Sequence, residues 1–144
     1  MAKLISTVCL VASIMFCSSQ QITNEFITGK WVVDSVALNM EAGNSKQKDA
    51  LAQMVKGFEK VQFDFKPNGN LDIKYPDGKA PEIFDDLFPP GKQLQWKFSE
   101  AERLISIGTS KDYLSLMGFV VSNQGKQVCF SIEETEIKLR VKKM

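Results

Sequence analysis

VQFDFKPNGNLDIKY, residues 61–75, alternates apolar and polar side chains on both sides of a central turn. Such alternation is typical of a strand with one buried face. The centre, residues 67–70, contains Asn68-Gly69, a pair that tolerates the positive φ angles of a tight hairpin. The alternating apolar positions are Val61, Phe63, Phe65, Leu71, Ile73 and Tyr75. The stretch therefore predicts an antiparallel hairpin with one apolar face.

The same period of two continues on either side of this hairpin. Turn signals separate the apolar runs at residues 99–102, 108–112, 123–125 and 133–134. We expect strands at residues 30–38, 61–65, 71–75, 94–98, 104–107, 113–122, 128–132 and 137–141. Short strands joined mostly by turns predict a mainly β fold, an antiparallel up-and-down sheet. Eight strands can close into a barrel that is either filled by side chains or holds one small ligand.

One segment interrupts the β pattern after the first strand. In residues 44–58 the apolar side chains recur at helical spacing, and polar side chains occupy the opposite face. The apolar face consists of Ala50, Leu51, Met54, Val55 and Phe58. Asn44 or Ser45 can cap the start, and Gly57 lies near the end. We expect one amphipathic helix, which covers an open end or the outside of the barrel.

The longest connection, residues 76–92, is rich in proline and glycine and carries Phe84, Leu87 and Phe88. Connections of this length often serve as lids or binding loops. One interpretation is that these side chains simply pack against the outside or one end of the barrel. The other is that they form a hydrophobic lid over a ligand cavity.

The N-terminus has the pattern of a secretory signal peptide over residues 1–19. Lys3 precedes an apolar run at residues 4–17, which is followed by Ser18 and Ser19. About fourteen residues are short for a bilayer-spanning helix, which needs roughly 20. One reading has cleavage after Ser19, and a second has lipid attached to Cys17, because residues 14–17 resemble a lipobox at Ile14 and Cys17. A third reading is an uncleaved, buried N-terminal segment.

We therefore expect an exported protein, in the periplasm, anchored to the outer membrane or extracellular. Its single mature domain would comprise residues 20–144, and its only contact with a membrane would be a lipid on Cys17. Without Lys3, basic and acidic residues balance at 17 each. Nucleic-acid binding, which needs a strong basic excess, is not expected.

The residues that commonly carry catalysis are scarce. The chain has no histidine, which is the commonest general base and metal ligand. Cys129 is the one cysteine beyond residue 17, so neither a disulfide nor a cysteine zinc site is expected within the mature domain. Asp85-Asp86 and Glu133-Glu134 are read as solvated charges. We expect no enzyme activity, no metal and no cofactor.

Several short motifs resemble a known family. Gly29-Lys30-Trp31 opens the first strand, and Phe63-x-Phe65-x-x-Asn68-Gly69 forms the hairpin. Together they resemble the small secreted lipocalin-like domains of Bacteroidetes. Lys111-Asp112-Tyr113 is similar to the Thr-Asp-Tyr signature of lipocalins at two of its three positions. The resemblance implies that Gly29, Trp31 and Arg140 are structural, with Arg140 packed over the Trp31 ring.

The sequence supports two functions. The first is non-catalytic binding of a small hydrophobic ligand in the barrel or at its mouth, where the barrel of such proteins offers an apolar cavity. The candidate ligand-binding residues are Phe63, Phe65, Phe84, Phe88, Trp96 and Phe98. The alternative is an interaction or structural module with a filled barrel, which docks a protein or glycan partner through the helix or through residues 76–92.

The export prediction can be tested by intact-mass analysis of the protein recovered from its native host. We expect a mass that begins near residue 20, or one that begins at Cys17 and includes a diacylglyceryl group. A mass that begins at Met1 would show that no export processing takes place.

Overall fold

The structure is a computed structural model, and it describes residues 21–38, 45–110 and 114–144. The predicted signal peptide, with Cys17, and the motif at residues 111–113 lie outside these ranges. In the described ranges there is no helix with the length and apolar character to cross a bilayer.

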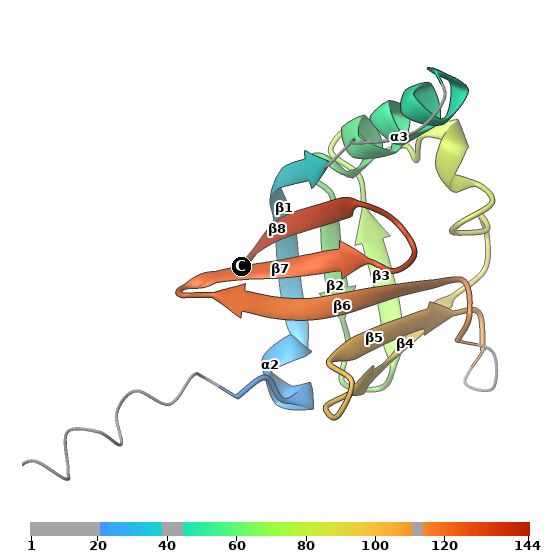
Figure 1. Cartoon of the computed structure of the whole chain (residues 1–144). Helices are drawn as coiled ribbons and strands as arrows, with labels where there is room; N and C mark the ends of the chain where they lie inside the picture. Colours follow the sequence, from blue (N-terminus) through green and yellow to red (C-terminus); the bar gives the residue numbers. More distant parts are fainter. Residues whose placement is uncertain (1–20, 39–44, 111–113) are drawn as a thin grey trace, which may run out of the picture.

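Eight antiparallel strands form one closed barrel in chain order, as predicted (Figure 1). The strands are β1 (Gly29–Leu38), β2 (Gln62–Phe65), β3 (Asn70–Lys74), β4 (Leu94–Ser99), β5 (Leu104–Gly108), β6 (Met117–Gln124), β7 (Gln127–Ile132) and β8 (Ile137–Lys143). Strand β6 begins later than expected because its register with β5 starts at the pair Ile107 and Met117. The hairpin turn between β2 and β3 has Gly69 at φ +92°, the positive value predicted from Asn68-Gly69.

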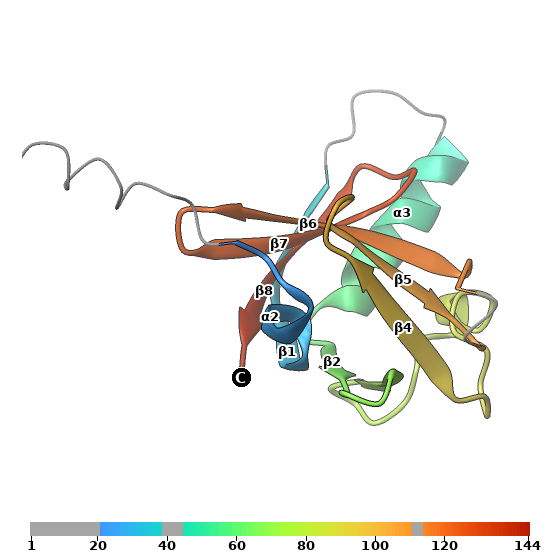
Figure 2. The ribbon, with the colours of Figure 1, turned by 90° about the horizontal axis from the view of Figure 1, so that it is seen from below.

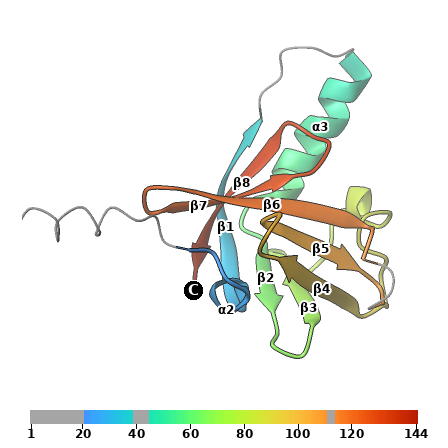
Figure 3. The ribbon, with the colours of Figure 1, turned by 60° about the horizontal axis from the view of Figure 1, so that its bottom comes forward.

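Two helices cover opposite ends of the barrel (Figures 1 and 3). The short helix α2 (Asn24–Ile27) precedes β1 and was not predicted from the sequence. The Thr23 hydroxyl caps it by accepting a hydrogen bond from the Phe26 amide at 3.1 Å. The carbonyl oxygen of Ile27, the last residue of the helix, accepts a 2.8 Å hydrogen bond from the Trp31 indole. This bond joins the helix to the first strand of the barrel.

The predicted amphipathic helix is α3 (Ser45–Phe58), which follows β1. Phe58 at its end is fully buried, and its ring lies 4.7 Å from the ring of Phe84. Phe84 belongs to a single 3-10 turn, η2 (Glu82–Phe84), in the connection between β3 and β4. Leu51 and Met54 are only half-buried against the core. The helix is therefore fixed mainly by its C-terminal turn.

Aromatic side chains fill the inside of the barrel. The Phe65 and Trp96 ring centroids are 5.2 Å apart, and the Phe63 and Phe119 centroids are 5.5 Å apart. Phe130 continues the cluster toward Trp31. Edge-to-face and offset contacts at such distances are the favoured arrangements of aromatic pairs. The rings come from β1, β2, β4, β6 and β7, so the cluster joins strands that are not neighbours.

The contact between α3 and η2 gives a test of how closely the helix packs. A Cβ atom at Gly57 would lie 2.8 Å from Phe84 Cζ, and Phe84 is only 1% exposed. Alanine improves helix propensity by about 1 kcal/mol, but overpacking a core typically costs about 1–3 kcal/mol. We expect Gly57→Ala to lower the free energy of unfolding in urea, by about 1 kcal/mol.

Phe84→Leu in the Gly57→Ala background should restore part of this loss, which a double-mutant cycle would measure. Gln53→Ala, on the exposed side of α3, is the matched control and should change stability by less than about 0.5 kcal/mol. If Gly57→Ala stabilised the protein, the close approach of α3 to η2 would be contradicted.

Candidate ligand site between strands β3 and β4

The barrel wall is weakest between β3 and β4. Only two residue pairs join these strands, Asn70 with Gln95 and Leu71 with Leu94. By comparison, four pairs join β2 to β3 and five join β4 to β5. Beyond Leu71 no residue pair joins the two strands, and residues of the 76–92 connection lie beside this part of the wall.

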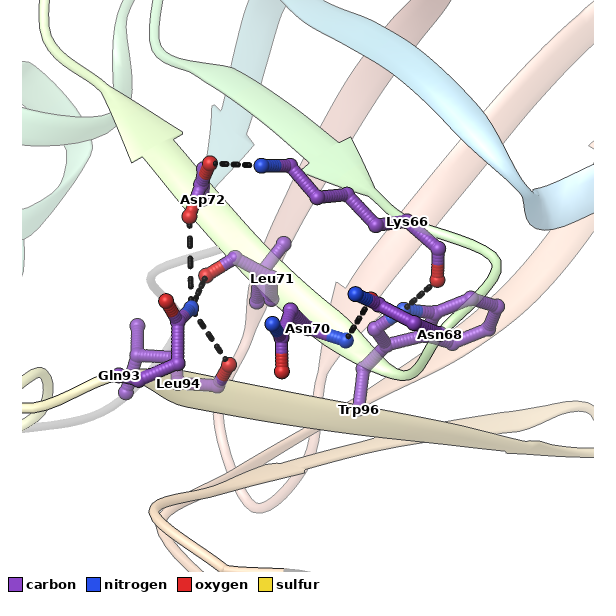
Figure 4. Close-up of polar contacts among 8 residues, drawn as sticks. All are labelled: Lys66, Asn68, Asn70, Leu71, Asp72, Gln93, Leu94 and Trp96. Atoms are coloured by element: carbon purple, nitrogen blue, oxygen red, sulfur yellow. Dashed lines mark hydrogen bonds and ion pairs between the residues drawn. The ribbon is translucent and has the colours of Figure 1, made fainter.

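A side-chain amide continues the hydrogen bonding at the point where the ladder stops (Figure 4). Gln93 Nε2 donates to the carbonyl oxygens of Leu71 at 3.2 Å and Leu94 at 3.0 Å. It also lies 3.3 Å from a carboxylate oxygen of Asp72. The amide has two hydrogens, so the three acceptors share them. Gln93 thus links β3 to the start of β4 without a further pair of backbone bonds.

Charged and polar groups of the hairpin turn continue these contacts away from the opening (Figure 4). Lys66 Nζ lies 2.7 Å from the Asp72 carboxylate, and the Lys66 carbonyl accepts a 3.0 Å hydrogen bond from the Trp96 indole. The hydrogen bond from Lys66, with a second from Gln93, lowers the pKa of Asp72. Since both ion-pair partners are solvent-exposed, the pair positions the turn and contributes little to stability.

The opening forms a hollow of about 550 Å³, a volume typical of small-molecule sites. Its apolar walls come from Leu71, Ile73, Tyr75, Phe88, Pro90 and Leu94. The β3 residues among them occupy alternate positions, the same positions that face the barrel interior along the strand. The hollow therefore adjoins the apolar core, and Asp72, Asp85, Lys92 and Gln93 make the rest of its wall polar.

The two phenylalanines of the 76–92 connection lie in different places. Phe88 is 7% exposed and forms part of the wall of the hollow. Phe84 packs behind it, 5.9 Å from the Phe88 ring and in contact with Phe58 of α3. The Phe88 amide donates a 2.7 Å hydrogen bond to the Phe84 carbonyl, which fixes this part of the connection as a turn. Phe84 is thus packed between α3 and Phe88, and Phe88 lines the hollow.

The other candidate ligand residues lie in the filled interior. Phe63, Phe65 and Trp96 pack in the aromatic cluster, and Phe98 is 7% exposed further along β4. Of the six candidates, Phe88 alone contributes to the hollow between β3 and β4. The candidate ligand residues predicted from the sequence did not include Ile73, Tyr75 or Gln93. Pairing of β3 with β4 ends at Leu71 and its pairing with β2 ends at Lys74, so Pro76 does not set the point where the wall opens, and no local sequence signal marks that point.

A second hollow, of about 360 Å³, lies where α3 approaches the barrel rim. Met54 of α3, Leu87 of the 76–92 connection and Leu116 before β6 contribute to its wall. It is smaller than the hollow between β3 and β4, and none of the six candidate ligand residues lines it.

The packing over Trp31 differs from what the resemblance implies. Lys143, rather than Arg140, places its ammonium over the ring, 5.4 Å from the ring centroid. The reason is register, because Lys143 pairs directly with Trp31 while Arg140 pairs with Ser35 across a bulge in β1. Arg140 is exposed, and its guanidinium lies 3.5 Å from the Ser35 hydroxyl. Gly29 has a backbone φ of +124°, a value that residues with a side chain rarely adopt.

Within residues 21–38, 45–110 and 114–144, no group of three or more His, Cys, Asp or Glu residues is placed to hold a metal ion. Cys129 is buried. The chemistry that the hollow offers is apolar contact with a hydroxyl, an amide and carboxylates at its edge. Comparison of the chain with known protein families, with curated proteins and with solved structures gives no match.

The Tyr75 hydroxyl, at the edge of this site, makes the free energy of unfolding depend on pH. Burial, followed by the charge of Asp85, raises its pKa from 10.0 to about 12. The unfolded chain loses this proton near pH 10, and the folded protein retains it until about pH 12. The resulting stability is complete below pH 10 and is lost as the pH rises through about 12.

We therefore expect the free energy of unfolding to fall more steeply between pH 10 and 12 in the wild type than in Tyr75→Phe. Urea unfolding at a series of pH values would measure this dependence in the two proteins, and an absorbance titration of tyrosinate would measure the pKa of Tyr75. Equal slopes for the two proteins would contradict the burial of Tyr75.

Proposed function

We propose that this protein is a non-catalytic binding protein that takes a small apolar ligand in the hollow between β3 and β4. The observation that carries the proposal is the hollow of about 550 Å³, with apolar and polar walls, at a break in the barrel wall. Ligand pockets are concave and mostly apolar, with a few polar groups that orient the ligand. Leu71, Ile73 and Leu94 supply the apolar surface, and Tyr75 and Gln93 supply polar atoms at the edge.

The surrounding elements suit a rigid site with one movable wall. The ladder between β2 and β3 and the filled interior hold the strand side in place. On the opposite side, Phe84 is held against α3, and Phe88 lies over the hollow. A ligand larger than the hollow would displace the Phe88 ring while Phe84 stays anchored. Burying apolar ligand surface here would contribute about 25 cal/mol for each Å² before the entropic cost of binding.

The resemblance to secreted lipocalin-like domains and the predicted signal peptide support the same proposal. A carrier of apolar molecules at the cell envelope would be exported, either free or attached by a lipid on Cys17. In this protein the ligand would occupy the wall rather than the centre of the barrel, because aromatic rings occupy the centre.

The filled interior also favours the second function, an interaction module with a solid barrel. In that case the barrel is a scaffold and a partner binds its outer surface. The two functions differ in whether an apolar small molecule binds the hollow.

The test uses the fluorescent apolar probe N-phenyl-1-naphthylamine and two matched variants. Ile73→Asn places a polar side chain in the wall of the hollow, and we expect it to weaken probe binding about tenfold or more. Leu116→Asn makes the same kind of change at the hollow beneath α3 and should leave binding within about twofold of the wild type.

Circular dichroism melting of both variants shows whether each is folded, and native mass spectrometry of the wild type looks for a co-purified lipid. Absence of probe binding to the wild type, or equal losses in the two variants, would contradict the proposed site. A loss confined to Leu116→Asn would place the ligand beneath α3 instead.

A further inference from the structure

Charge is unevenly distributed between the strands. The whole chain has a formal net charge of +1, with 18 basic and 17 acidic residues. Strand β8, with the sequence IKLRVKK, contains four basic residues and no acidic residue. The ion pairs within 4.0 Å among the described residues are Lys60 with Asp34 and Lys66 with Asp72, so the basic residues of β8 take part in neither.

Three of these residues form a line on the outside of the barrel. Lys138, Arg140 and Lys142 alternate with the buried residues Ile137, Leu139 and Val141. Because alternate residues of a strand are about 6.8 Å apart on one face, the line is about 14 Å long. Across from it, Lys138 pairs with Ala37 and Ser131, and Arg140 pairs with Ser35 and Cys129. No acidic side chain occupies these paired positions.

The nearest acidic groups lie at the margins of this line. Glu133, Glu134 and Glu136 are in the turn that precedes Ile137, beyond the Lys138 end. Asp34, near the other end, is engaged with Lys60 at 3.6 Å. Asp34 therefore offsets part of the positive charge at the Lys142 end, whereas the positions paired with Lys138 and Arg140 carry no carboxylate.

At the Lys142 end the line reaches a hollow of about 480 Å³. Lys126, Lys142 and Lys143 contribute to its wall together with Phe26, Trp31 and Asn123, and Asp34 is the one acidic residue among the described residues that line it. Figures 2 and 3 show the β6–β7 hairpin, whose turn carries Lys126, reaching beyond the barrel on the side where β8 ends. The hollow therefore lies where three segments distant in the sequence come together.

One cation of this hollow has a fixed position. Lys143 Nζ donates a 2.7 Å hydrogen bond to the Phe26 carbonyl and lies 5.3 Å from the Phe26 ring centroid. These contacts hold the ammonium in place before any ligand arrives, and it has three N–H donors in total. A preorganised cation loses less conformational entropy on binding an anion than a free lysine does.

We propose that Lys126, Lys138, Arg140, Lys142 and Lys143, here called the basic face, bind a linear acidic polysaccharide. The hollow takes one acidic sugar, and the line along β8 takes the following charges of the chain. Ammonium, guanidinium and amide groups all donate hydrogen bonds to carboxylate and hydroxyl oxygens.

Two other polyanions fit this face less well. Proteins that lie on a bilayer insert apolar or aromatic side chains into it, and the exposed large hydrophobic residues of the described chain are only Val120 and Met144. Nucleic-acid binding depends on a strong basic excess, which a net charge of +1 does not provide. The basic face involves β1, β7 and β8, so this inference does not depend on the apolar site between β3 and β4.

The test is binding of the full exported protein to polygalacturonate, a linear polymer of uronic acid, at low ionic strength. We expect binding that weakens as salt is added and no binding to neutral dextran. Arg140→Gln combined with Lys142→Gln should weaken binding about tenfold or more. The matched control, Lys74→Gln combined with Lys97→Gln, removes the same charge from exposed positions on β3 and β4 and should change binding less than about twofold.

Glutamine at these outward positions leaves the buried face of β8 intact, and a melting curve for each double variant verifies its folding. Equal losses in the two double variants would show a general charge effect and overturn the proposal. It would also be overturned by no binding to polygalacturonate, by equal binding to dextran, or by binding only to vesicles of phosphatidylglycerol and phosphatidylcholine. Probe binding at the β3–β4 hollow, measured on the same proteins, should be unchanged by Arg140→Gln with Lys142→Gln.

Discussion

Pairing between the first and last strands is the constraint on which the structure depends. Strand β8 pairs with β1 over seven residue pairs, from Trp31 with Lys143 to Leu38 with Ile137. This pairing closes the sheet and removes the two edges that an open sheet would expose. It also places Lys143 over Trp31, where the Lys143 ammonium donates a hydrogen bond to the Phe26 carbonyl of α2. The same closure leaves a small interior, which aromatic rings occupy.

A filled interior moves any binding function to the wall or to the outer surface. Rings from five strands are in contact at the centre, so a ligand there would have to displace several of them. The weakest part of the wall lies between β3 and β4, where two residue pairs and the Gln93 amide replace a longer ladder. Local loss of pairing thus gives the barrel the hollow between β3 and β4 without opening its core.

The helix and strands that local periodicity determines were predicted from the sequence. Residues 61–75 predicted the β2–β3 hairpin, residues 44–58 predicted α3, and the remaining alternating runs predicted the other strands of the closed barrel. The hollow between β3 and β4 was not predictable, because it depends on where these two strands stop pairing. That point is set by the register of the whole sheet. The cation over Trp31 was misassigned to Arg140 for a related reason, since the register of β8 on β1 places Lys143 opposite Trp31 and Arg140 opposite Ser35.

The order of the strands along the chain has a consequence for how the molecule assembles. The strand that completes the barrel is the last of the eight, and its partner β1 lies about a hundred positions earlier. Until residues 137–143 are available, β1 and β7 both present unpaired backbone, and the aromatic cluster has no closed wall around it. Long-range pairing of this kind slows folding relative to local helices. A chain interrupted before β8 would consequently be prone to associate with other chains through these edges.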